Sequence, residues 1–346
     1  MKDKIEKLVN DSNVKKEDKD VFKKTLAKVM NADKEINNEL KNNQDNICIA
    51  FKEDPLLCVN ETARPAIKSH IVPDNELEKM INKYGEIYNV NNMIHSVIKN
   101  EDVLNKSIAN RDSTCFKGFC SECDKNFSND INIDNPDNIT KQHMYKYLFR
   151  YLGREISATM LYVKKIKDLH NKNEDGMNKL ILHSYGVNFN EHIEKKIELL
   201  KYLKMEMIEM DILLKKRHNP KLHPAYIFGM IKCNENYGLI GQSLIFSKLI
   251  TDIEIPLPFF LLFKEVDDKT YIYYFHINKV GINWLSRLNN TNEKFNFLSI
   301  LAYYNSTHLY FNEDFANNKI KNIKDYIKEN KIYDFEDLIK YVKKIK

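Results

Sequence analysis

The sequence predicts an α+β fold, with helices in its first and middle parts and a sheet towards its C-terminal end. Two observations support this prediction. Apolar residues recur at intervals of three and four between residues 140 and 218, as they do in amphipathic helices. From residue 225 to residue 311 the chain instead carries short runs rich in Tyr, Phe, Ile and Leu, which are typical of buried strands.

The first half of the chain divides into two predicted segments. Residues 1–46 have apolar positions at helical spacing, which predict two helices broken near residues 11–13 and a loop over residues 42–46. Residues 47–130 contain short β-prone pieces, three prolines and most of the cysteines, together with a predicted short helix over residues 76–83. We therefore expect this second segment to form a module of its own.

The second half also divides into two predicted segments. Residues 131–220 are predicted to be helical, with a long amphipathic helix from Glu191 to Arg217. This helix is expected to pack in a bundle, and a coiled-coil dimer is the alternative. Residues 221–346 are predicted to form a β-rich domain that ends in a helical tail, with a hairpin turn at residues 267–269.

Composition limits the class of protein. The chain is 43% hydrophobic and 30% charged, which is enough apolar material for sizeable cores and argues against global disorder. A bilayer-spanning helix needs about 20 apolar residues, and the N-terminus is charged, so we expect no membrane segment, no secretory signal and a cytoplasmic protein. The net charge of +5 permits nucleic-acid binding without requiring it. Glycine patterns of nucleotide-binding loops are absent.

The cysteines are unevenly placed. Six occur in 346 residues, and five of them fall between Cys48 and Cys123. In a chain without an expected secretory signal, this clustering suggests a metal site rather than a disulfide framework. The Cys120-x-x-Cys123 spacing lets two thiolates reach one tetrahedral zinc ion, although a redox pair has the same spacing. We expect a structural zinc ion here.

A structural zinc site needs two further ligands. Cys48 and Cys58 form one candidate pair, whereas Cys58 and His70 form another, and Cys115 is a further candidate. Spacing alone does not choose among them.

Two short motifs follow one another in this segment, SHIVP at residues 69–73 and FCSECDK at residues 119–125. Their order resembles that of the HNH endonucleases, which build their site on a treble-clef zinc scaffold. The resemblance implies that His70 is the general base that activates water. It also implies that Asp124 holds a catalytic Mg²⁺ or Mn²⁺ ion in place of the usual His, that Asn110 is the intervening Asn, and that DNA or RNA is the partner.

The chain is also similar to a set of uncharacterised bacterial proteins that carry Ser-His-x-Ile and Phe-Cys-x-x-His-Asp motifs. Here Cys123 replaces the His of the second motif, and either residue can bind zinc. This similarity implies no established activity, but it suggests an antiviral defence effector. Ser69 departs from the HNH pattern because it stands where an Asp is usual.

Each candidate also has a structural interpretation. His70 could be a zinc ligand, Asp124 could cap a helix, and Arg150 or Arg154 could pair with Glu155. Residues 305–308 are predicted to form a turn. The sequence therefore supports two hypotheses: a metal-dependent, HNH-like nuclease, and a non-catalytic, zinc-stabilised binding or sensor protein. The latter would recognise a protein or nucleic-acid partner through its C-terminal domain.

Overall fold

The computed structural model describes residues 14–42, 48–50, 58, 62–90, 104–108, 114–128, 135–215, 226–246, 258–277, 285, 288, 290–305, 308–319, 325–326, 329–331, 340–341 and 344. These residues form an α+β fold, as the sequence predicts. Within these ranges, no helix combines the length and the apolar character that crossing a membrane requires.

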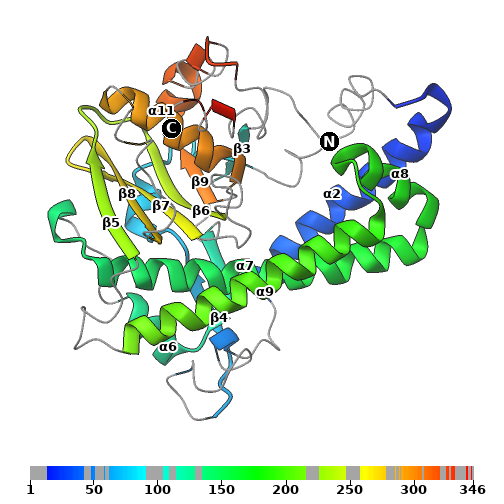
Figure 1. Ribbon diagram of the computed structural model, residues 1–346, viewed down its shortest axis with the longest axis horizontal. Coiled ribbons are helices and arrows are strands. Elements are labelled where there is room, and N and C mark those ends of the chain that lie inside the picture. The colour runs from blue at the N-terminus through cyan, green and yellow to red at the C-terminus, as the bar shows by residue number, and fades with distance from the viewer. Residues whose placement is uncertain are drawn as a thin grey trace.

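Four long helices make up the helical part: α2 (Lys19–Asn42), α7 (Lys141–Lys172), α8 (Glu174–Tyr185) and α9 (Phe189–Lys215). Helix α9 confirms the predicted long amphipathic helix, and it lies along α7 (Figure 1). Helix α2 is continuous and follows a short 3₁₀ turn at Lys16–Asp18. The predicted break at residues 11–13 lies outside the described residues, as do residues 43–46 of the predicted loop.

In the described part of the chain, seven strands form one antiparallel sheet, in the order β3-β2-β9-β6-β7-β8-β5. Two of them come from the predicted module at residues 47–130, and five come from the predicted C-terminal domain. They are β2 (Glu86–Val90), β3 (Leu104–Ile108), β5 (Tyr226–Lys232), β6 (Leu239–Phe246), β7 (Pro258–Val266), β8 (Lys269–Ile277) and β9 (His308–Phe311). The turn predicted at residues 305–308 is wrong at His308, which begins β9 and is buried.

The turn between β7 and β8 confirms the predicted hairpin. Asp267 and Asp268 have φ angles of 47° and 56°, so both central residues of this two-residue turn are left-handed. Such turns match the natural twist of the flanking strands, and Asp tolerates this conformation better than most residues. Local chemistry therefore fixes the register of these strands.

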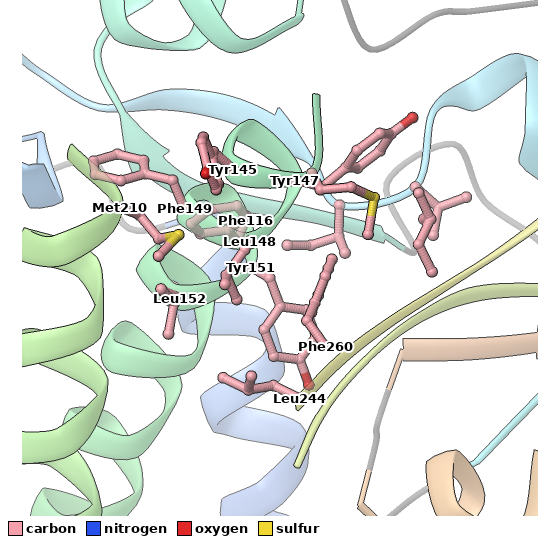
Figure 2. Close-up of a cluster of buried hydrophobic side chains, with 14 of the residues drawn as sticks. Phe116, Tyr145, Tyr147, Leu148, Phe149, Tyr151, Leu152, Met210, Leu244 and Phe260 are labelled. Carbon is pink, nitrogen blue, oxygen red and sulfur yellow. The ribbon is translucent and has the colours of Figure 1, made fainter. Parts of the chain in front are cut away.

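The sheet is covered on both faces. In Figure 1 it lies between α11 (Thr291–Asn305) on one side and α7 with α9 on the other, while α2 and α8 extend away from it. Alternate residues of β7 enter the two cores: Phe260 and Leu262 face the α7 side, whereas Phe259, Leu261 and Phe263 enter the α11 side. Figure 2 shows the α7 side of the sheet, where the Tyr151 and Phe260 rings meet edge to face.

A second, two-stranded sheet lies beside α7. Strands β1 (Ile67–His70) and β4 (Cys115–Phe119) pair in antiparallel fashion, and α6 (Ser121–Ser128) begins directly after Cys120. Helix α4 (Asp74–Glu78) starts earlier and is shorter than the predicted helix at residues 76–83. Beyond α4, the Asn82 side-chain oxygen accepts the backbone N–H groups of Tyr84 and Glu86, which closes a turn before β2.

Candidate metal centre

Four cysteines from three parts of the chain meet beside the two-stranded sheet. Cys120 follows β4 and Cys123 lies in the first turn of α6, so the β4–α6 junction supplies two thiols. Cys48 lies beyond the end of α2, and its backbone N–H donates to the carbonyl of Arg64 at 2.9 Å. Cys58 completes the group, and all four side chains are buried.

The spacing of these thiols fits a zinc ion. Cys58 Sγ lies 3.8 Å from Cys48 Sγ, 3.8 Å from Cys120 Sγ and 3.7 Å from Cys123 Sγ. All four sulfurs lie within 4.8 Å of one another. Tetrahedral zinc with Zn–S bonds of about 2.3 Å places its ligand sulfurs about 3.8 Å apart, whereas a disulfide needs about 2.05 Å. The group could therefore bind a metal ion such as zinc, and its four cysteines form no disulfide.

His70 lies outside this group of four. It sits at the end of β1, opposite Cys115 in the strand register. Cys115 Sγ is 3.2 Å from His70 Nε2 and 3.3 Å from Nδ1, and Thr114 Oγ1 is 3.3 Å from Nδ1. Of the two ligand sets that the sequence leaves open, the structure brings together the one made only of cysteines. Among the described residues, the metal-binding group includes neither His70 nor Cys115.

Asp124 is engaged by an arginine of α7. It is the fourth residue of α6, so it does not cap this helix, and its Oδ1 accepts from Arg150 Nη2 at 2.9 Å. The two side chains are 15% and 6% exposed, respectively. Burial lowers the pKa of Arg150, and the neighbouring Asp124, Tyr147 and Cys115 oppose this shift. Arg150 therefore joins α6 to α7 and lies in the electrostatic surroundings of Cys115, the neighbour of His70.

Glu155 pairs with Arg154, one of the two arginines that the sequence suggested, and also with His308. Its Oε1 accepts from Arg154 Nη1 at 2.8 Å and from His308 Nε2 at 2.9 Å. Burial raises the pKa of Glu155, but Arg154 and His308 outweigh this effect and bring the pKa to about 2. Burial, followed by the charge of Arg154, lowers the pKa of His308 to about 4. At neutral pH an ionised Glu155 therefore accepts from a neutral His308, which connects α7 to β9.

A buried ion pair, which the sequence analysis missed, fixes the segment that follows His70. Lys264 of β7 is 2% exposed, and its Nζ lies 2.7 Å from Glu76 Oε1 in α4 and 3.2 Å from the Tyr147 hydroxyl in α7. Burial raises the pKa of Tyr147 well above its ordinary value, and the Glu76 carboxylate adds to this. The sequence signal was a lysine within the apolar run of β7, since buried lysines require a partner.

A hydrogen bond from the large sheet also holds the end of β1. Gln242 Nε2 in β6 donates to the carbonyl of Ile71 at 2.8 Å, and both residues are buried. The remaining site residue from the sequence, Asn110, lies outside the described residues.

Comparisons of the chain with protein-family models, with curated proteins and with solved structures found no match.

Proposed function

We propose that the chain is a zinc-stabilised, HNH-like nuclease that hydrolyses phosphodiester bonds of DNA or RNA. The observation that carries this proposal is the composition of the metal-binding group. Four thiols satisfy a tetrahedral ion without His70. The imidazole of His70, at the end of β1, is therefore not needed as a zinc ligand, and we assign it the role of the base.

In this proposal the zinc ion is structural. It fixes the β4–α6 junction to the segments that carry Cys48 and Cys58, and its binding energy adds to the folding energy of the module. His70 takes a proton from the water molecule whose oxygen bonds to phosphorus, while the bond from phosphorus to the leaving sugar oxygen breaks and that oxygen takes a proton from solvent. The second motif supplies Asp124, which lies one residue after the zinc ligand Cys123.

A catalytic Mg²⁺ or Mn²⁺ ion does not fit the described residues as they stand. The Asp124 carboxylate already accepts from Arg150, and a guanidinium 2.9 Å away competes with a cation for the same oxygen. The metal-binding group found among the described residues consists of thiols alone, whereas Mg²⁺ prefers oxygen ligands. We therefore derive no step through a divalent ion.

The same ion pair favours a second candidate function, a zinc-stabilised binding or sensor protein without catalytic activity. In this reading Arg150 and Asp124 only hold α6 against α7, and His70 is a structural side chain. Ser69, which stands where the HNH pattern has an Asp, is buried in β1 and agrees with this second hypothesis. Two further parts of these proposals rest on the sequence. The binding protein would recognise its partner through the C-terminal sheet region, and the nuclease would act in antiviral defence.

Zinc binding is tested first, by metal analysis of the purified protein. We expect one zinc ion per chain, lost in Cys120→Ser and in Cys123→Ser. Cys233→Ser is the matched control, because Cys233 is an equally buried thiol outside the group of four. Undiminished zinc in both of the first two variants would overturn the ligand assignment.

Nuclease activity is tested by nicking of plasmid DNA and cleavage of a single-stranded RNA, with Mg²⁺, with Mn²⁺ and with EDTA. We expect wild-type protein to cleave one of them and His70→Ala to lose at least about 100-fold in rate while it keeps its zinc. His170→Ala, in the last turn of α7, serves as the control and keeps the wild-type rate. Inert wild-type protein under all conditions would favour the non-catalytic candidate.

A further inference from the structure

The Thr114 hydroxyl indicates which ring nitrogen of His70 carries the proton. Thr114 Oγ1 donates to the carbonyl of Val72 at 3.1 Å and also lies 3.3 Å from His70 Nδ1. A threonine hydroxyl has one proton and accepts with its lone pairs. Because its proton is directed to Val72, the hydroxyl can only accept from the imidazole, and the donor in this contact is therefore Nδ1–H.

The hydroxyl has little freedom to choose another partner. Thr114 is 3% exposed and Val72 is 1% exposed, so turning the proton away from the carbonyl would leave a buried acceptor without that hydrogen bond. The backbone fixes both residues, because the N–H of Ile71 donates to the carbonyl of Thr114 at 3.1 Å. The strand register in turn sets His70 opposite Cys115, directly beside Thr114.

We propose that Thr114 is a positioning residue, which holds neutral His70 in the Nδ1–H tautomer and leaves Nε2 as the proton acceptor of the site. Cys115 Sγ lies 3.2 Å from Nε2 and 3.3 Å from Nδ1, so with Nδ1 protonated the thiol can donate to Nε2. The assignment of the tautomer rests on the Thr114 contact, since the thiol lies near both ring nitrogens. The role of Nε2 as the general base rests on the proposed nuclease function, since that function gives His70 a proton to accept.

The tautomer is measured by long-range ¹H–¹⁵N correlation spectra of protein labelled in its histidine rings, with His70 assigned from the signals that His70→Gln removes. We expect a protonated Nδ1 and an unprotonated Nε2 in the wild-type protein at pH 7.5. Thr114→Val keeps the shape but removes the acceptor, so we expect the signals of His70 to move towards a mixture of tautomers. Thr114→Ser keeps the hydroxyl, and we expect it to keep the wild-type tautomer.

The activity measurement uses the same three proteins in the nicking assay. We expect Thr114→Val to reduce the rate at least about tenfold without loss of zinc, and Thr114→Ser to restore it to within about twofold of wild type. A residue that only supported the fold would not move the tautomer and the rate together.

Two results would overturn the assignment: a wild-type His70 protonated at Nε2, or an unchanged tautomer in a folded Thr114→Val. The wild-type spectrum alone decides the first point, so the proposal stays testable even if Thr114→Val does not fold. A wild-type protein with the Nδ1–H tautomer but without cleavage would confirm the positioning by Thr114 and contradict the nuclease function. The two proposals can therefore fail separately.

Discussion

Replacing Lys264 tests whether its buried ion pair holds the segment after His70 in place. Lys264→Met keeps most of the side-chain volume but removes the charge that compensates Glu76, which is 7% exposed. Removing one partner of a buried pair costs about 3–5 kcal/mol, because the other charge remains in the low-dielectric interior. The Tyr147 hydroxyl also loses its contact with Nζ. We therefore expect the free energy of unfolding to fall by about 3–5 kcal/mol.

The measurement is urea unfolding of the zinc-loaded protein, followed by circular dichroism. The double variant Lys264→Met with Glu76→Gln removes both charges, and we expect it to recover most of the loss, since replacing a whole buried pair is often close to neutral. Lys165→Met is the control for the loss of a lysine, because its partner Glu35 is 62% exposed. An exposed pair contributes at most about 1 kcal/mol.

Two results would refute this reasoning. If Lys264→Met lowered the free energy of unfolding by no more than Lys165→Met does, the buried pair would not contribute the stability that its burial implies. If the double variant lost as much as the two single variants together, the loss would come from packing rather than from an uncompensated charge. Either result would remove the argument that the ion pair orders α4 against β7.

Three further predictions concern packing, pH and metal. Gly153→Ala should lower the melting temperature, because the added Cβ would lie 2.4 Å from Phe119 Cζ. Overpacking costs about 1–3 kcal/mol, which exceeds the gain of about 1 kcal/mol from the higher helix propensity of Ala. Between pH 6.5 and pH 4, His308 binds a proton in the unfolded state but not in the native state. The free energy of unfolding should therefore fall as the pH falls through this window. His308→Gln should reduce this fall when the free energy is measured by urea unfolding at several pH values. Removing zinc with a chelator should make four more thiols reactive towards Ellman's reagent and should lower the melting temperature, and an unchanged thiol count would contradict the site.

Local patterns were sufficient to predict some elements. The apolar spacing of α9 depends only on its own residues, and the Asp267–Asp268 turn depends on two backbone conformations, so the sequence predicts both. The pairing of β1 with β4 could not be predicted in this way, because 44 residues separate their paired ends, His70 and Cys115, in the chain. Two strands of the module at residues 47–130 also join the large sheet, which no periodicity within that segment indicates.

The candidate site shows the same division. Cys120 and Cys123 are a local signal, and the sequence identified them together with Cys48 and Cys58. The choice between Cys48 and His70 as the fourth ligand needed the fold, because both lie far from the β4–α6 junction in sequence. Charged partners were harder still. Whether Arg150 pairs with Asp124 or with Glu155 depends on how α6 packs against α7.

Three connections bear on the β1–β4 strand pair that carries His70. A zinc ion on the four thiols would fix the end of β4, Gln242 donates to the carbonyl of Ile71 after β1, and Arg150 pairs with Asp124 between α7 and α6. A strand pair held in this way would set the position of the imidazole as proton transfer requires. Rigidity alone does not require catalysis, however, since a binding surface benefits from it equally. Arg150 bears on the choice, because Asp124 could hold a divalent ion only if its carboxylate gave up the contact with Arg150, whereas a binding role is compatible with the pair as it stands.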